Sequence, residues 1–316
     1  MSAAQLAVVA VTHNSSRVIE GWVDALEATG RRSQMELCVV DSGSSPEERR
    51  FLRERVAPRV EVVCERPNLG YGRCCNVGAE QTGAPALLFT NPDASVQSVP
   101  DAVWNGGLID GQLLGAFKQL PDGGVIPQGF RRYRTAAREA ETLVLGRFRR
   151  ELGRTAESPA WVSGAALIVR RADFDRIGGF SAELFMYCED ADLRLRHRAA
   201  GGSVAVDPAF LIEHGSGKSS AVDDPDRLAG ALESVNRHST RTFAARHGRP
   251  WQRGLLYALL VVVYIPRRVV AILLRGGRNR SRVGSYALDL LLPRRVMRRL
   301  GVPDWAARGR RRGGRR

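Results

Sequence analysis

The chain has few of the features that mark a secreted or membrane-spanning protein. Its five cysteines are odd in number and none forms a Cys-x-x-Cys pair, which argues against a disulfide framework or a zinc site. Residues 1–14 lack the basic segment and long apolar stretch of a signal peptide. A strongly apolar run, residues 254–265, is too short to span a bilayer, and Arg267 and Arg268 follow it. We therefore expect a cytoplasmic protein with reduced thiols.

Positive charge is concentrated at the C-terminal end of the chain. The 316 residues carry a net charge of +15, and residues 267–316, with 16 arginines, no lysine and two acids, account for +14 of it. Such a polycationic segment favours an anionic surface, either acidic lipid or nucleic acid. Because no aromatic side chain is interleaved with the arginines from Arg308 onward, we expect no specific nucleic-acid partner. We therefore predict that the segment attaches the protein peripherally to the inner face of the cell membrane. For residues 254–274, the alternative is a pair of helices packed against the rest of the chain.

The first hundred residues alternate between apolar runs and segments with helical periodicity. Strands are predicted at 6–11, 37–40, 60–64 and 86–89, and helices after 14–16, after Ser45 and at 72–81. This order predicts an α/β fold with a Rossmann-like, mostly parallel central sheet and helices on both faces. Beyond it, the patterns predict a turn at 121–124, a basic helix at 133–151, a buried strand at 165–169, a helix at 189–200 and a short strand at 203–206. We expect one domain over residues 1–220 and a helical, basic region over residues 221–316.

Polar residues follow the predicted strands, at the place where open α/β sheets bind their ligands. They are Thr12 and Asn14 after the first strand, Asp41 after the second, and Asn91 and Asp93 after the fourth. A carboxylate at a strand end is suited to hold a divalent cation against a diphosphate, which makes Asp93 a candidate metal ligand. Asp41 is a candidate for hydrogen bonds to a nucleotide, and ordinary turn formation is the alternative for both carboxylates.

Three acids lie at the start of a predicted helix. Glu189, Asp190 and Asp192 fall in its first turn, where the helix dipole favours negative charge. Capping accounts for one or two acids, but three carboxylates this close repel one another, which favours proton uptake by one of them. The cluster therefore predicts a general base that activates an acceptor hydroxyl.

Two glycine-rich segments resemble phosphate-binding motifs without matching them. Residues 68–78 depart from the dinucleotide fingerprint because Cys75 stands at the third glycine position, so we expect a tight turn whose helix N-terminus faces an anion. Residues 214–219 depart from the P-loop pattern because Ile212 stands at its first glycine. We expect His214 to be a metal ligand and Lys218 to lie near a phosphate, although a lone histidine is more often structural.

These motifs occur in a defined order along the chain: Val-Thr-His-Asn at 11–14, Asp-Ser-Gly-Ser at 41–44, Asn-Leu-Gly at 68–70, Asn-Val-Gly at 76–78, Asn-Pro-Asp at 91–93, Trp-Val-Ser-Gly at 161–164, Gly-Gly-Phe at 178–180, Glu-Asp-Ala-Asp at 189–192, and His214. The order resembles family 2 glycosyltransferases of the GT-A type and, within them, bacterial rhamnosyltransferases that act on N-acetylglucosaminyl-diphospho-polyprenol. The resemblance covers about residues 5–250. It implies an inverting, metal-dependent transfer of a sugar from a nucleotide diphosphate donor to a lipid-linked or other glycan acceptor, in the synthesis of cell-envelope polysaccharide.

The resemblance also implies roles for individual residues. Asp190 would be the catalytic base, with Glu189 and Asp192 as supporting acids, and Asp93 and His214 would bind Mg²⁺ or Mn²⁺. Ser163, Gly164 and Lys218 would line the acceptor and diphosphate side. The residues that would bind the donor are Thr12, Asn14, Asp41, Asn68, Gly70, Gly72, Asn76, Asn91 and Asp93.

Several points stay open at the level of sequence. Many family members have two acids in the metal motif, whereas here Asn91 occupies the first position. The donor is either dTDP-rhamnose or another nucleotide sugar, such as UDP-GlcNAc or UDP-galactofuranose. A nucleotidyltransferase is disfavoured because Arg17 is the one early basic candidate for a triphosphate. A nucleic-acid-binding protein acting through the Arg-rich tail is the alternative of a different class, and a homo-oligomer is left open.

Overall fold

A computed structural model describes residues 4–128 and 162–214, together with helical residues 235, 236, 238–240, 242, 243, 245–247, 258 and 262. The chain divides into two compact units. One comprises Met1–Phe130, Ala156–Ala182 and Glu189–Asp223, and the other comprises Arg131–Thr155, Glu183–Cys188 and Asp224–Arg316. The helix expected at 133–151, Lys218 and the Arg-rich tail lie outside the described residues.

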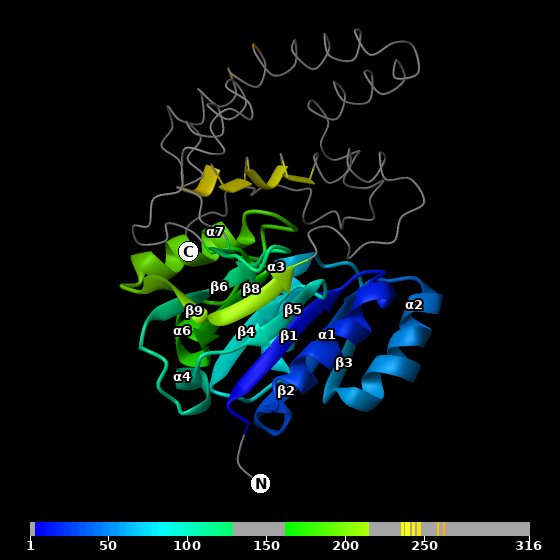
Figure 1. The fold of residues 1–316 in the computed structure, drawn as a ribbon. Coiled ribbons are helices and arrows are strands. Elements are labelled where there is room, and N and C mark those ends of the chain that lie inside the picture. The colour runs from blue at the N-terminus through cyan, green and yellow to red at the C-terminus, as the bar shows by residue number, and fades with distance from the viewer. Residues whose placement is uncertain are drawn as a thin grey trace. The chain divides into compact units, whose positions relative to one another are not determined.

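The first unit alternates strands and helices in its N-terminal half (Figure 1). Its elements are β1 (Leu6–Thr12), α1 (Ser16–Ala28), η1 (Arg32–Gln34), β2 (Met35–Ser42), α2 (Pro46–Phe51), η2 (Leu52–Val56), η3 (Ala57–Arg59), β3 (Val62–Arg66), α3 (Tyr71–Glu80), β4 (Ala86–Thr90), β5 (Ala94–Ser98), α4 (Asp101–Trp104), β6 (Gln112–Gln119), β7 (Val125–Pro127), β8 (Ala166–Arg170), α6 (Arg171–Arg176), α7 (Glu189–Ala199) and β9 (Ser203–His214). The strands and helices expected in the first hundred residues are therefore present, with β3 shifted two residues toward the C-terminus.

The strands form one mixed sheet in the order β3-β2-β1-β4-β8-β6-β9-β5, and β7 pairs with β6. The strands β1 to β4 are mutually parallel, as the sequence predicts. The expectation of a mostly parallel sheet is wrong for the second half, where β8 runs antiparallel to β4 and β6, and β5 runs antiparallel to β9. A local apolar pattern does not specify strand direction, and the polar or proline-containing strands β5, β6 and the second half of β9 give weak strand signals.

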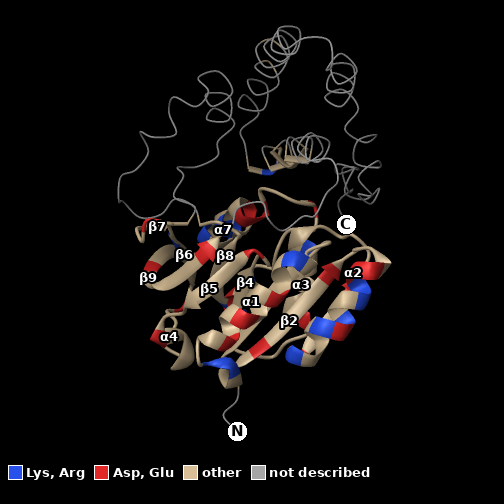
Figure 2. Cartoon of the chain, turned by 45° about the vertical axis from the view of Figure 1, so that its right-hand side comes forward, with Lys and Arg blue, Asp and Glu red and all other residues tan. Residues whose placement is uncertain are grey.

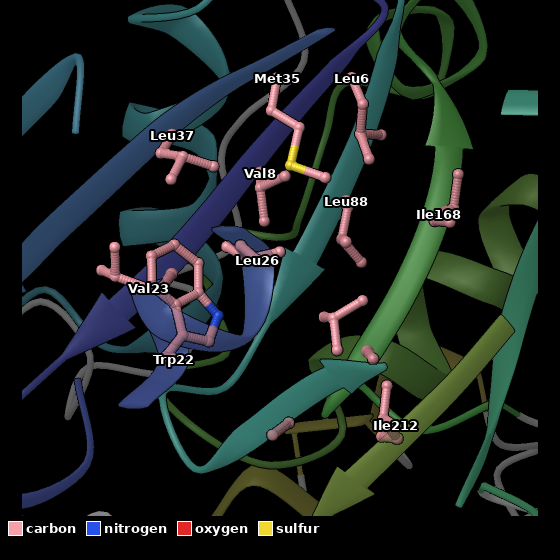
Figure 3. Close-up of a cluster of buried hydrophobic side chains, with 14 of the residues drawn as sticks. Leu6, Val8, Trp22, Val23, Leu26, Met35, Leu37, Leu88, Ile168 and Ile212 are labelled. Carbon is pink, nitrogen blue, oxygen red and sulfur yellow. The ribbon is translucent and has the colours of Figure 1, made fainter. Parts of the chain in front are cut away.

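Apolar side chains alternate along the strands and form a core on each face of the sheet. Leu6 and Val8 point toward α1, where Trp22, Val23 and Leu26 pack against them (Figure 3). The intervening strand residues, Ala7 and Val9, face the opposite core, which includes residues of α3, α6 and α7. The expectation of helices on both faces is therefore confirmed.

Basic and acidic residues are interspersed along α2 (Figure 2). Arg59 binds Asp24 and Glu27 of α1, and Arg55 binds Glu20 at 3.0 Å. These pairs are at the surface, where each contributes at most about 1 kcal/mol. No helix among the described residues is long and apolar enough to cross a membrane.

The strand register brings the functional segments to one edge of the sheet. Thr12 at the end of β1 is level with Asp41 of β2, and Thr90 at the end of β4 is level with Ala166 at the start of β8. His214 at the end of β9 is level with Ala94 at the start of β5. The antiparallel half of the sheet therefore places residues 163–165 and His214 beside the residues that follow β4.

Candidate functional site

The loops after β1 and β2 are joined by hydrogen bonds. The side chain of His13 contacts the Ser42 carbonyl through Nδ1 at 2.9 Å, the Asn14 N–H donates to the Ser44 hydroxyl at 2.9 Å, and the Asn14 side-chain oxygen accepts from the Ser45 N–H at 2.9 Å. Asn14 has a φ of 52°, which places it in the left-handed region that asparagine tolerates best among residues with a side chain. The two loops thus form one rigid rim at the carboxyl ends of β1 and β2.

Asp41 is fully buried in this rim. Its carboxylate accepts a hydrogen bond from the Ser44 N–H at 3.2 Å and lies 3.9 Å from the guanidinium of Arg49. Burial raises the pKa of Asp41 above its usual range, although the bonds from Ser44 and the charge of Arg49 act in the opposite direction. Thr12 beside it is also buried. The geometry therefore shows a turn-capping carboxylate whose second role, in binding a nucleotide, belongs to the proposal below.

The glycine-rich segment before α3 packs closely against its neighbours because several of its residues have no side chain. Gly70 has a φ of 83° at the start of the helix, a conformation that favours glycine. Asn68 accepts a hydrogen bond from the Ser42 hydroxyl at 3.2 Å, which ties this segment to the β2 loop. Gly72 is close-packed, because a Cβ there would lie 3.0 Å from Cβ of Phe180. The segment therefore approaches both the β2 loop and the turn before α7.

Asn76, which the resemblance assigns to the donor, makes a different set of contacts. Its amide nitrogen donates to the Phe180 carbonyl at 2.9 Å, and its amide oxygen accepts from the Phe180 N–H at 2.8 Å. Both ends of the amide are thus engaged with the turn at residues 177–180. We assign Asn76 to holding that turn against α3.

Asp93 and His214 lie side by side at the junction of β5 and β9. Asp93 Oδ1 is 3.4 Å from His214 Nε2, and both side chains are buried. On its other side, His214 Nδ1 is 3.2 Å from the side-chain amide of Gln128. Among the described residues, no group of three or more His, Cys, Asp or Glu side chains is arranged to hold a metal ion. A carboxylate oxygen and an imidazole nitrogen are suitable ligands for Mg²⁺ or Mn²⁺ when donor oxygens and water complete the coordination.

Residues 163–165 connect this pair to the acidic cluster. The Ser163 N–H donates to the Gln128 carbonyl at 3.3 Å, and the Ala165 carbonyl accepts from the Asn91 N–H at 3.0 Å. Between them, the Gly164 N–H donates to Asp190 Oδ2 at 3.0 Å. The segment at 163–165 therefore contacts Gln128, Asn91 and Asp190 within three consecutive residues, and brings segments distant in the sequence to one place.

The three acids of α7 differ in their surroundings. Asp190 is half-buried, and its Oδ1 accepts the N–H of Ala191 at 2.7 Å while Oδ2 accepts the N–H of Gly164. Asp192 is fully buried and binds Arg196 at 2.8 Å, and Arg196 also donates to the Ile177 carbonyl at 2.7 Å. We assign Asp192 to an internal ion pair that holds the turn at 177–180. Glu189 is buried near Tyr71 and Cys75, whose pKa values its charge helps to raise.

Two contributors to the site were not found in the sequence. Gln128 and Tyr71 contact His214 and Gly164, respectively. Neither belongs to a pattern with a chemical signature, because a lone amide or phenol becomes informative only through its neighbours. Ser163, Gly164, Asn91, Asp93, Asp190 and His214 were named from sequence, and the structure brings all six together.

A parallel β-α-β half is thus joined to a mixed half, and an acid-and-histidine pair and an acidic helix lie at the same sheet edge. A model of Glycosyl transferase family 2 matches residues 7–177, and the chain belongs to this family. It is therefore a glycosyltransferase family 2 enzyme.

Among curated proteins, the chain is 31% identical over 280 residues to N-acetylglucosaminyl-diphospho-decaprenol L-rhamnosyltransferase of Mycobacterium tuberculosis, covering 80% of this chain and 89% of the relative. It is also 46% identical, over 54 residues that cover 17% of this chain and 20% of the relative, to Rhamnosyltransferase WbbL of Escherichia coli K12.

Solved structures with the same fold include two glycosyl-transferring enzymes. Mannosyltransferase PcManGT from Pyrobaculum calidifontis, in complex with GDP-Man and Mn²⁺, superimposes with a TM-score of 0.54 at 14% identity, covering 97% of this chain and 86% of that one. Glucosyl-3-phosphoglycerate synthase from Mycobacterium tuberculosis, in complex with Mn²⁺, UDP and glucosyl-3-phosphoglycerate, superimposes with a TM-score of 0.50 at 19% identity, covering 78% and 80%. At these identities the likeness concerns the fold, a mixed sheet covered by helices.

Proposed function

We propose that the chain is a metal-dependent, inverting rhamnosyltransferase that moves L-rhamnose from dTDP-rhamnose to a lipid-linked N-acetylglucosaminyl diphosphate. The observation that carries the proposal is the hydrogen-bonded segment at 163–165, which contacts Asp190 directly and leads to Asp93 and His214 through Asn91 and Gln128. A donor diphosphate and an acceptor hydroxyl must both lie within a few ångströms of the transferred sugar. This edge of the sheet offers groups for each. The name of the Mycobacterium tuberculosis relative supports the choice of sugar and acceptor.

In this proposal the rim at the ends of β1 and β2 binds the nucleotide. Thr12, Asn14 and Asp41 lie there. Asn68, which precedes Gly70 and Gly72, packs against Gly43 of the same rim. The preformed bonds between the two loops keep these groups in position before the donor arrives, which reduces the ordering cost of binding. Asn91 lies between this rim and the 163–165 segment, through its N–H bond to Ala165.

Asp190 is proposed as the base. It takes up the proton of the acceptor hydroxyl as that oxygen attacks the anomeric carbon from the side opposite the diphosphate. One displacement of this kind inverts the anomeric centre, so no enzyme nucleophile is needed. Ser163 and Gly164 border the acceptor side, and Glu189 adds negative charge next to Asp190 at the start of α7.

Asp93 and His214 would hold the divalent cation. When bound, Mg²⁺ or Mn²⁺ neutralises the charge that develops on the departing diphosphate. The pair supplies one oxygen and one nitrogen 3.4 Å apart in a buried setting, which fits two adjacent positions around such a cation. EDTA should therefore abolish transfer and Mn²⁺ or Mg²⁺ should restore it, and full activity in chelator would refute the metal proposal.

The donor is tested by thermal shift and donor hydrolysis against a panel of nucleotide sugars in Mn²⁺. dTDP-rhamnose should give the largest rise in melting temperature, because a ligand that binds the folded state alone stabilises it more the tighter it binds at a given concentration. A larger rise with UDP-GlcNAc or UDP-galactofuranose would identify that nucleotide sugar as the donor in place of dTDP-rhamnose. The proposal of a glycosyltransferase would still hold. Absence of binding to every nucleotide sugar would contradict both.

The base is tested by Asp190→Asn. This variant should bind donor as the wild type does, while the rate of transfer falls by about 10² or more, the contribution typical of a positioned general base. Asp175→Asn on α6 is the matched control, because Asp175 is exposed and lies away from the 163–165 segment. Near-normal turnover in the Asp190 variant would remove that residue from the mechanism.

We also propose that the basic C-terminal region, residues 221–316, attaches the enzyme to anionic membrane where a lipid-linked acceptor is found. The charge of +14 over residues 267–316 supports this, since each basic residue near an anionic surface contributes about 1 kcal/mol. In flotation assays the full chain should bind vesicles containing phosphatidylserine and release them at high salt, and a chain ending at Gly254 should not bind. Equal binding to neutral vesicles would argue against electrostatic attachment, and preferential binding to DNA over vesicles would favour the nucleic-acid alternative.

A further inference from the structure

Gly164 is held by hydrogen bonds from two directions. The Tyr71 hydroxyl donates to the Gly164 carbonyl at 2.8 Å, and the Gly164 N–H donates to Asp190 Oδ2 at 3.0 Å. The ring of Tyr71 and the side chain of Asp190 flank this glycine, because a Cβ on Gly164 would lie 3.7 Å from Tyr71 Cε1 and 3.4 Å from Asp190 Cβ. Tyr71 and Asp190 therefore contact the same residue, Tyr71 at the Gly164 carbonyl and Asp190 at the Gly164 N–H.

Tyr71 is itself firmly placed. It is the first residue of α3, and its ring meets the edge of the Phe180 ring with centroids 6.2 Å apart. Phe180 is in turn bound through both backbone polar groups to Asn76, one turn further along the same helix. A phenol anchored in this way fixes the position of its hydroxyl, and through it the position of the Gly164 carbonyl.

The hydroxyl of Tyr71 also stays in its donor form. Burial raises its pKa well above the usual value for tyrosine, and Cys75 and the carboxylates Glu189 and Asp190 raise it further. A protonated phenol has one hydrogen to donate, and the Gly164 carbonyl receives it. The phenol therefore stays protonated at neutral pH and can donate this bond.

The orientation of Asp190 depends on two backbone N–H groups. Oδ1 accepts from Ala191 at 2.7 Å, within α7, and Oδ2 accepts from Gly164, outside the helix. The bond within α7 holds one oxygen, and the bond from Gly164 ties the second oxygen to the segment at 163–165.

We propose that Tyr71 is a positioning residue for sugar transfer: its hydroxyl holds Gly164 so that the Gly164 N–H orients the carboxylate of Asp190. This inference rests on the proposed role of Asp190 as the base. Tyr71 itself contacts neither donor nor acceptor in the proposal, so its removal affects the rate of the chemical step and leaves donor binding unchanged.

The test is a double-mutant cycle with Tyr71→Phe and Asp190→Asn, measured as kcat and as KM for the donor. Tyr71→Phe alone should lower kcat about tenfold with an unchanged donor KM, as expected for loss of one hydrogen bond that acts in the transition state. In the Asp190→Asn background, Tyr71→Phe should cause no further loss, because the group it positions is already absent. An equal tenfold loss in both backgrounds would overturn the proposal and indicate a general structural role.

Thr82→Val is the matched control. It also removes a hydroxyl next to α3, but Thr82 lies two residues after the C-terminal end of that helix, where it bonds to the Gly78 carbonyl and to Arg171. This variant should lose stability without changing kcat. A fall in kcat equal to that of Tyr71→Phe would mean that destabilisation of α3 is the cause, and would contradict the proposal.

A second measurement does not depend on the Phe variant being stable. Hydrogen exchange at the Gly164 amide should be slow in the wild type and faster in Asp190→Ala, because the N–H loses its acceptor. Unchanged exchange would show that the Gly164–Asp190 bond is absent in solution and would refute the positioning role. The role of Asp190 as the base is tested separately from the role of Tyr71, because normal transfer by Asp190→Asn would contradict the proposed function.

Discussion

His214 illustrates how one neighbour sets the chemistry of a side chain. Its Nε2 faces Asp93, and its Nδ1 faces the side-chain amide of Gln128 at 3.2 Å. A histidine that binds a cation through Nε2 carries its proton on Nδ1, and that proton needs an acceptor. Rotation of the Gln128 amide by 180° places its oxygen there, an arrangement equivalent in shape to the other. In the structure the amide nitrogen of Gln128 faces Nδ1, and with the amide rotated Gln128 would support the tautomer of His214 that binds metal in the proposal.

The first prediction concerns this pair. Gln128→Leu should weaken Mn²⁺ binding about tenfold, the lower end of the effect of removing a hydrogen-bond partner from a metal-binding histidine. The affinity is measured from the free Mn²⁺ signal in electron paramagnetic resonance, without donor or acceptor. Gln119→Leu, on β6 of the same hairpin, is the control and should bind Mn²⁺ normally. Wild-type affinity in the Gln128 variant would show that His214 binds metal without this support, or does not bind it.

At the same scale, two residues of the motifs make contacts within the protein. Asn76 and Asp192 both occur in motifs of the family, yet Asn76 binds the backbone of Phe180 and Asp192 binds Arg196. Both bring the turn at 177–180 against the helices that carry the site. A motif can thus persist because it holds a turn next to a reacting group.

At the scale of elements, α1 obtains its N-terminal cap from another segment. The sequence offers Asn14, Ser15 and Ser16 as caps, but Ser15 at the N-cap makes no capping bond through its side chain. Instead, the carboxylate of Glu48 accepts the Ser16 N–H at 2.9 Å and the Ser16 hydroxyl at 2.6 Å. Glu48 stands in the first turn of α2, whose own cap is Ser45, as the sequence predicts. One acid therefore joins the starts of both helices.

The second prediction follows from this shared cap. Glu48→Ala should lower the free energy of unfolding by about 1–2 kcal/mol, because it leaves an N–H at the start of α1 without its charged acceptor. The change is measured by urea denaturation. Glu47→Ala, at the neighbouring exposed position of the same turn, should leave the midpoint of the urea transition nearly unchanged. Equal losses in the two variants would show that helix propensity, and not the cap, is responsible.

At the scale of the whole molecule, all five cysteines are free and buried, which confirms the expectation of reduced thiols. Cys38 and Cys64 lie on neighbouring strands, and burial, followed by the charge and hydrogen bond of Cys64, raises the pKa of Cys38 to about 12. Burial also raises the pKa of Cys74 and Cys75. These thiols pack as small apolar groups, and the thiolate needed for oxidation or metal binding is disfavoured.

The third prediction concerns these thiols. At pH 8 the native protein should react with a thiol reagent much more slowly than the urea-unfolded chain, in which all five cysteines react.

Because the pKa of Cys38 is raised from 9.0 to about 12 in the folded state, the folded protein keeps a proton that the unfolded chain loses. The free energy of unfolding should therefore be unaffected by Cys38 below pH 9 and decline as the pH rises toward 12. Cys38→Ala should show a smaller decline between pH 9 and pH 11, and an identical decline would assign the effect to other groups.

The family, the parallel half of the sheet and the helices on both faces could be predicted from the sequence, and the site residues named from it stay predictions. These features follow from local patterns: an apolar run of strand length, a helical period, a polar residue at a strand end. The direction of β8 and the pairing of β5 with β9 were decided by tertiary structure alone, since strand direction depends on contacts between distant segments. The same holds for the roles of Tyr71, Gln128 and Glu48, because a single phenol, amide or carboxylate acquires its function from the groups that the fold places within about 3 Å of it.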